Sequence, residues 1–233
     1  MDNIFLTGIS DAVSLVVSLD PEVLAVTAMT LKVCLTAVTV ATIIGIPFAA
    51  FLSWGKFPGR NALIMFANTM MGLPPVVAGL VVVLFLWRAG PLGSLEWLYT
   101  PKAMVLVQTV LAFPIVVALS VAAYNGVNPR FRVQMQLLGA SRWQEFLIVT
   151  KEARLGIIAA VAAATGQVFS EVGAVIMVGG NIKGETRMLT TAIVLETRQG
   201  NFGPALALSF ILIGLILAAG GILTWIQYRK RKG

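Results

Sequence analysis

The sequence predicts an all-α membrane protein with about five transmembrane helices, and its composition, apolar segments and charge placement each favour that class. Hydrophobic residues make up 58% of the 233 residues, charged residues only 12%, and the mean hydropathy is +0.90. A domain of this size and composition would be difficult to keep in solution. Histidine is absent and Cys34 is the single cysteine, so disulfide frameworks, zinc sites and Cys/His catalysis are not expected. We expect no metal and no cofactor.

Five segments are long enough to cross a hydrocarbon core, which takes about 20 residues of apolar helix. They are residues 31–52, 63–87, 104–124, 156–178 and 205–226. The apolar stretch 4–19 is shorter, and Asp11 interrupts it, so we expect a helix along the membrane surface, with a span as the alternative. The expected organisation is an interfacial segment, 1–22, followed by a transmembrane domain, 23–233.

Basic residues fall mainly on one side of a five-span topology. Eleven of the 17 Lys and Arg residues lie there, including those of the loop at about 128–154 and the tail 229–232. The positive-inside rule therefore places this side in the cytoplasm and the N-terminus outside. No basic surface interleaved with aromatic residues accompanies the net charge of +7, so nucleic acid is not an expected partner. Asp2 and the lack of a basic start argue against a cleaved signal peptide.

The polar loop at 128–154 has the pattern of two short helices joined by a tight turn. Asn128 can cap a helix that begins at Pro129 and should run to Leu138. Gly139 can adopt the left-handed conformation that ends a helix, and Ser-Arg-Trp-Gln at 141–144 matches the capping box of the next one. An amphipathic loop on the bilayer surface and a docking site for another protein both fit this pattern.

The stretch LLGASRWQEFLIV at 137–149 resembles the glycine-centred cytoplasmic motif of permease subunits of binding-protein-dependent ABC importers. In that family the loop docks in a groove of the ATPase. The match departs at both ends, because 132–136 lacks the usual Glu-Ala-Ala triplet and Lys-Glu at 151–152 replaces a hydrophobe and proline. The resemblance implies a coupling helix, and it assigns the ATPase contact to Leu138, Gly139, Ala140, Ser141, Arg142 and Trp143.

Two other stretches are similar to the molybdate, tungstate and sulfate permeases of that family. Residues 57–85, with their Leu-Pro-Pro break, resemble the second core span, and residues 166–208 resemble the run that contains Asn-Ile-x-Gly-x-Thr-Arg. The wording at 178–197 looks most like the tungstate type. The resemblance, which covers the chain from about residue 31, implies the type I importer permease fold, a separate ATPase, an external binding protein and an oxyanion cargo. The cargo expected from this resemblance is tungstate, with molybdate or sulfate as alternatives.

Two positions in the predicted spans indicate a transport pathway. Pro74 and Pro75 remove backbone donors, so the second span should be kinked or broken there, which membranes tolerate only beside protein or water. Gln167, Ser170 and Glu171 are polar residues in the fourth span, where an ionisable group is costly. A structural kink and a carboxyl group satisfied by neighbouring helices are the alternatives. The candidate gate residues are Pro74, Pro75, Gln167, Ser170, Glu171, Val172 and Gly173.

The remaining expectations concern assembly and energy supply. Five spans make a thin wall around one pathway, and small residues on the fourth span permit close helix packing, so we expect a homodimer with the pathway on its axis. The chain has no G-x-x-x-x-G-K-[ST] loop, so we expect it to be no enzyme and ATP hydrolysis to belong to a partner. An ion-driven secondary transporter is the main alternative class, although five spans do not divide into equal halves. A membrane-embedded enzyme is the third class, but the sequence offers no nucleophile-base pair that would indicate a reaction.

Overall fold

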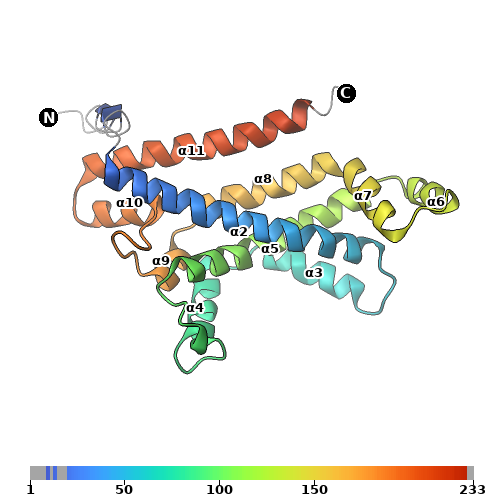
Figure 1. Cartoon of the computed structure of the whole chain (residues 1–233), viewed down its shortest axis with the longest axis horizontal. Helices are drawn as coiled ribbons and strands as arrows, with labels where there is room; N and C mark the ends of the chain where they lie inside the picture. The colour runs from blue at the N-terminus through green and yellow to red at the C-terminus, as the bar shows by residue number, and fades with distance from the viewer. Residues whose placement is uncertain (1–8, 11–12, 15–19, 230–233) are drawn as a thin grey trace.

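The structure is a computed structural model that describes residues 9–10, 13–14 and 20–229, and this part of the chain contains helices and loops but no strand. Figure 1 shows an elongated bundle whose long helices run side by side. Three helices are long and apolar enough to cross a membrane, or five spans result if each of two bent helix pairs counts as one. The predicted all-α membrane class is confirmed.

Helices α2 (Pro21–Trp54), α5 (Pro101–Asn125) and α8 (Arg154–Ser170) form the centre of the bundle. Their shared core is apolar and fully buried, and it includes Val33, Met104, Val107, Val116, Val168 and Phe169. Helix α2 begins ten residues before the apolar stretch that the sequence indicated. The reason is local, because Oδ1 of Asp20 accepts from the N–H groups of Glu22 (2.9 Å) and Val23 (3.0 Å), and proline occupies the first helical position.

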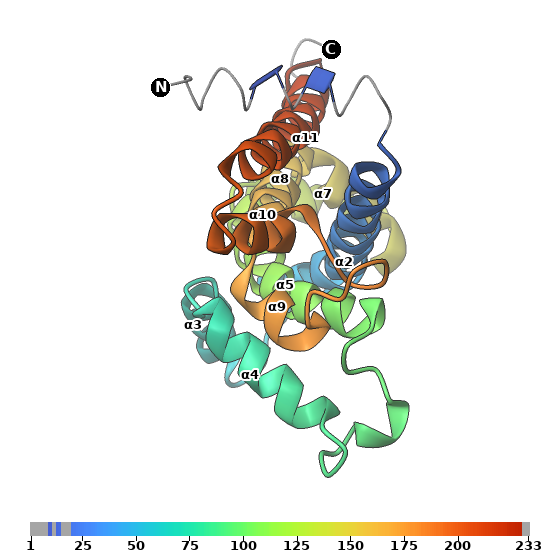
Figure 2. The same ribbon diagram turned by 90° about the vertical axis from the view of Figure 1, so that its left-hand side faces the viewer.

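The second and fourth spans are both broken. Helices α3 (Arg60–Met70) and α4 (Pro75–Leu86) meet at 107°, so the predicted break at the two prolines is confirmed. Helix α4 points away from the bundle axis, as Figures 1 and 2 show. The fourth span consists of α8 and α9 (Gly173–Gly179), which meet at 62°. The sequence did not indicate this second break, because no proline accompanies it.

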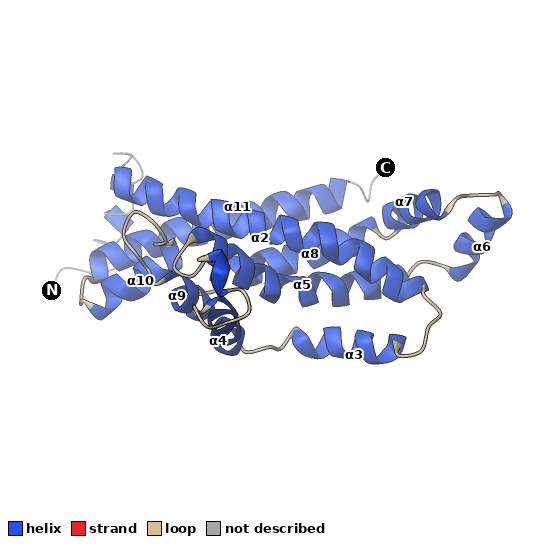
Figure 3. Ribbon diagram, turned by 60° about the horizontal axis from the view of Figure 1, so that its bottom comes forward, coloured by secondary structure: helices blue, strands red, loops and turns tan. Residues whose placement is uncertain are grey.

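Short helices form both ends of the bundle (Figures 1 and 3). Helices α6 (Pro129–Leu137) and α7 (Arg142–Glu152) form one end. The 3-10 helix η1 (Gly93–Leu95) follows α4, and α10 (Leu189–Arg198) leads into the long α11 (Phe202–Arg229), which packs along α10 and α8. Most of the predicted interfacial segment 4–19 lies outside the described residues, so that assignment stays a prediction.

Candidate coupling turn and transport pathway

The turn between α6 and α7 is held by hydrogen bonds on both sides. Gly139 has a φ of +78°, and the N–H groups of Gly139 and Ala140 donate to carbonyls in the last turn of α6 at 3.1 and 3.0 Å. These are the two bonds of a Schellman motif. On the other side, Ser141 Oγ accepts from the N–H of Gln144 (3.3 Å), and Gln144 Oε1 accepts from the N–H of Ser141 (2.8 Å). The predicted glycine cap and capping box are confirmed, and together they make the turn stiff.

The tip of this turn is apolar and open to solvent. Leu137 and Leu138 are 81% and 80% exposed, and Trp143 is 66% exposed. The tip projects from the end of the molecule, as Figure 1 shows. A cluster of exposed apolar side chains beside polar ones is typical of a surface that another protein covers. The six residues assigned to ATPase contact therefore lie together on one protruding turn.

An ion pair joins α6 to α7, and its arginine also contacts the end of α2. Glu145 is 2% exposed, and its carboxylate accepts from Arg132 Nε at 2.6 Å and Gln136 Nε2 at 3.3 Å. The Arg132 guanidinium also lies 4.7 Å from the ring centre of Trp54, at the end of α2. The Trp54 ring in turn meets the ring of Tyr124, near the end of α5, at 5.2 Å. The sequence did not indicate this cluster, since Arg132 entered the interpretation as a basic residue of the loop and as part of a departure from the family motif.

Glu171 is the residue at which α8 ends. The side chain is 6% exposed, and its Oε1 accepts from the N–H of Ala174 at 2.9 Å, inside the first turn of α9. The neighbouring Ser170 is exposed, and its hydroxyl donates back to the carbonyls of Gly166 and Gln167 at 3.0 Å each. The Glu171 contact fits the alternative in which neighbouring helix groups satisfy the carboxyl group.

The two span breaks pack against each other through α4 and α9. A Cβ atom on Gly173 would lie 3.2 Å from Cγ2 of Val76, which follows the two prolines. A Cβ atom on Gly79 would lie only 2.9 Å from the Cα of Ala174. Only glycine permits so close a backbone approach here. The proline break and the Glu171 break, predicted separately, therefore belong to one packed unit.

Buried groups from two other helices hold the last turn of α8. The carbonyl of Val168 accepts from Gln108 Nε2 of α5 at 3.1 Å and lies 3.8 Å from the Cys34 sulfur of α2. Both side chains are fully buried. Side chains of α2 and α5 therefore hold the Val168 carbonyl in place just before the break between α8 and α9. Gln108 was not predicted as a functional residue, although it is a polar residue within a predicted span, the same signal that selected Gln167.

Helix α3 exposes polar side chains, two of which, Asn68 and Thr69, lie within the predicted second span. Asn61, Asn68 and Thr69 are exposed and line a hollow of about 440 Å³ together with Ile64 and Met65. Polar side chains within a span are expected to face protein or water, because lipid offers them no hydrogen-bond partner. These residues were not singled out from the sequence, although Asn68 and Thr69 lie shortly before the break at the prolines.

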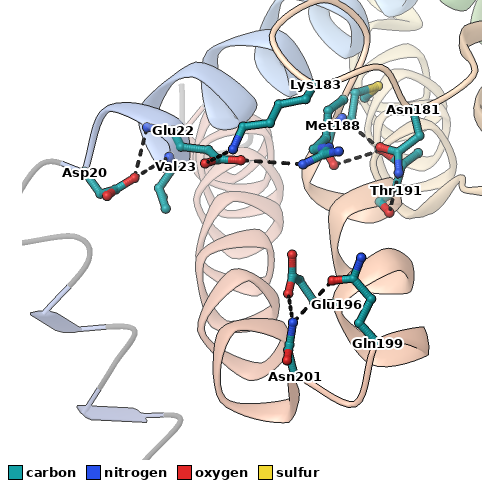
Figure 4. A network of polar contacts seen from close by, with 11 residues as sticks. Asp20, Glu22, Val23, Asn181, Lys183, Met188, Thr191, Glu196, Gln199 and Asn201 are labelled. Atoms are coloured by element: carbon teal, nitrogen blue, oxygen red, sulfur yellow. Dashed lines mark hydrogen bonds and ion pairs between the residues drawn. The ribbon is translucent and has the colours of Figure 1, made fainter.

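At the opposite end of the bundle, ion pairs tie the loop before α10 to the start of α2 (Figure 4). Lys183 Nζ lies 2.6 Å from Glu22 Oε2, and Arg187 Nη1 lies 3.5 Å from Glu22 Oε1. The N–H of Leu189 donates to Thr30 Oγ1 at 2.9 Å, which joins α10 to α2 more deeply. In the structure the carboxylate of Glu22 already engages both basic side chains.

Comparisons with known proteins agree with this architecture. Residues 41–232 match the family described as "Binding-protein-dependent transport system inner membrane component". The chain is 41% identical over 202 residues to a probable anion ABC transporter permease of Haloferax volcanii, covering 84% of this chain and 87% of that one. It is 32% identical over 220 residues to a tungstate uptake system permease of Peptoclostridium acidaminophilum, covering 94% and 96%.

A solved structure shows the same fold at low sequence identity. The structure of a bacterial alginate ABC transporter in complex with a periplasmic protein contains a chain that aligns with a TM-score of 0.70 at 17% identity. The alignment covers 88% of this chain and 78% of that chain. The predicted type I importer permease fold is confirmed. With its broken spans and its capped turn at the end of the bundle, the chain belongs to the family of inner-membrane permease components of binding-protein-dependent transport systems.

Proposed function

We propose that this chain is the permease subunit of an ABC importer for an oxyanion, most specifically tungstate. The names of its relatives, an anion permease and a tungstate permease, support the cargo. The observation that carries the coupling role is the stiff turn with its exposed apolar tip, Leu138 to Trp143. A rigid projection transmits the motion of an ATPase subunit without absorbing it. The chain itself hydrolyses nothing, and a separate ATPase supplies the energy.

The pathway in this proposal lies between two copies of the chain. The exposed polar side chains of α3 and the exposed Ser170 support it, since each needs protein or water as a neighbour within the membrane. The two-fold axis would pass beside the packed breaks of α4 and α9. Glu171 then positions α9 and does not bind the cargo, because a carboxylate repels a dianion by several kcal/mol at contact distance in a medium of reduced dielectric.

The expected location is the cytoplasmic membrane of a prokaryotic cell, with the N-terminus outside and the C-terminus inside. The excess of Lys and Arg on the side of α6 and α7 supports that orientation. An external binding protein would deliver the oxyanion to the opposite end. Selectivity then belongs to that protein, because a cage of fitted donors separates similar dianions better than a water-lined path.

Uptake by the reconstituted importer tests the cargo and the division of labour. Labelled tungstate should enter faster than molybdate, and sulfate should enter slowest. Exchange of the binding protein for a molybdate-selective one should shift the preference to molybdate, because the permease path would accept both ions. A tungstate preference that persists after the exchange would place selectivity in this chain, contrary to the proposal.

Cysteine substitutions at the break test the gate. Ser170→Cys and Val172→Cys should react with a water-soluble thiol reagent at rates that differ between the nucleotide-free and the ATP-bound importer, because the gate would open and close around them. The native thiol, Cys34, is buried and gives a low background. The matched control is Ser94→Cys, in the loop around η1. Equal reactivity in both states at 170 and 172 would count against a gate at this position.

A further inference from the structure

A groove of about 780 Å³ runs along the outside of α2 and α5, beside the loop that contains η1. Its volume lies within the range of about 300–1,000 Å³ that is typical of small-molecule sites. On α2 it is lined by Lys32, Thr36 and Val40, which lie four residues apart along one face of the helix. On α5 the matching row includes Lys102 and Val105. At about 1.5 Å of rise per residue, the groove follows the helices for about 12 Å.

The groove is charged at one end and less polar along its length. Lys32 and Lys102 are exposed, and neither makes an ion pair with a described residue. Lys102 Nζ lies 5.7 Å from the ring centre of Trp97. The carboxyl group of Glu96 also lines this end, so two lysines and one glutamate leave one positive charge in excess. Valine, leucine and threonine side chains line the rest.

The charged end of the groove lies beside the start of α5, the position at which a span meets the lipid headgroups. Lys102 lies in the first turn of α5, and Lys32 is the second residue of the apolar stretch 31–52 of α2. Lysines and a tryptophan at the ends of spans are typical of the membrane interface. Below them the groove runs parallel to the helices, in the direction that an acyl chain takes in the bilayer.

We propose that this groove binds one anionic phospholipid, in the leaflet opposite the α6–α7 turn. The phosphate would lie between Lys32 and Lys102, where its single negative charge matches the net charge of the groove mouth. One acyl chain would lie along Thr36, Val40 and Val105. A lipid whose headgroup carries a positive charge beside the phosphate would place that charge near the two lysines. It would therefore bind more weakly.

A second copy of the chain is a poorer occupant. To fill the length of the groove and neutralise the lysines together, it would have to present a carboxylate next to the apolar side chains of a span. Within the five apolar segments the single carboxylate is Glu171, which is buried and already accepts a hydrogen bond from α9. A phospholipid supplies both the negative charge and the apolar chain.

Native mass spectrometry of the intact importer tests the proposal. The purified complex is mixed with micelles that contain phosphatidylglycerol and phosphatidylcholine, and the lipid that remains bound is identified. The wild type should retain phosphatidylglycerol about tenfold over phosphatidylcholine, and Lys32→Gln combined with Lys102→Gln should reduce that preference to within about twofold. Thr36→Trp should lower the retention of both lipids, because the indole would fill the groove.

Arg88→Gln is the matched control. It removes an exposed positive charge near the same end of the molecule but outside the groove, so the lipid preference should stay unchanged. An unchanged preference in the double lysine variant would overturn the proposal, as would displacement of the lipid by added tungstate. A photoreactive group at position 36 that joins two copies of the chain would show that the groove is a subunit interface, and the lipid site would be wrong.

Discussion

Gly139→Pro is expected to abolish oxyanion uptake and to separate the ATPase from the permease. Proline fixes φ near −65° and has no N–H, whereas Gly139 has a φ of +78° and donates a hydrogen bond to the end of α6. The cost to the turn is about 3 kcal/mol or more, and it falls on the link between the two capped helices. The measurements are uptake in proteoliposomes and co-purification of the ATPase. Membrane insertion should be normal, because the turn lies outside the spans.

Gly200→Pro is the control for this substitution. Gly200 ends α10 with a φ of +80°, and the N–H groups of Gly200 and Asn201 donate to carbonyls in the last turn of that helix. Gly200→Pro thus breaks the same type of glycine helix cap at the opposite end of the molecule, where no ATPase contact is proposed. The ATPase should stay bound to this variant. If Gly139→Pro also keeps the ATPase and normal uptake, the docking site lies elsewhere.

Glu145→Gln is expected to give the second-largest loss, a fall in uptake of about tenfold or more. Loss of one partner of a buried ion pair typically costs about 3–5 kcal/mol. The cost here should be nearer about 2 kcal/mol, because the Arg132 side chain remains 25% exposed and water can solvate it. The α6–α7 unit would then loosen from Trp54, and transport should fall more than basal ATP hydrolysis by the assembled importer.

A second variant separates a structural effect from an electrostatic one. Removal of both charges, by Arg132→Gln together with Glu145→Gln, should recover part of the uptake, because no unpaired buried charge remains. Glu152→Gln, at the exposed end of α7, is the matched control and should behave like the wild type. A double variant that is worse than Glu145→Gln alone would contradict the ion-pair explanation.

The features that the sequence predicted correctly depend on residues close together in the chain. The capped turn is specified by 139–144, and the bend of the second span by two adjacent prolines. Such signals act within a few residues, because a cap or a missing donor changes the hydrogen bonds of its own helix end. The five spans were also predictable, since the apolar run that fills a hydrocarbon core is continuous.

The features that the sequence did not predict depend on contacts between different helices. Gln108 and Val168 are 60 residues apart, and Arg132 and Glu145 are joined across two helices. Nothing near Glu145 in the chain indicates that it is buried. The break after α8 has no proline, and it depends on the side chain of Glu171 as a cap for α9. Only the packing of α4 against Gly173 and Ala174 shows why the chain bends there.

The connection between α7 and α8 has a mechanical consequence. Ala153 alone separates the two helices, and its N–H and carbonyl continue their hydrogen bonds, at 2.9 and 3.1 Å. Helix α8 has 17 residues and α9 has 7, so at about 1.5 Å per residue the two arms measure about 25 and 10 Å on either side of the fixed Val168 region. Such a lever would turn a push of about 4 Å at α7 into a shift of about 2 Å at the far end of α9, given these arm lengths. The end of α9 would move less than α7 but with a larger force. A larger force is suited to separating α9 from α4, which pack tightly at the two breaks.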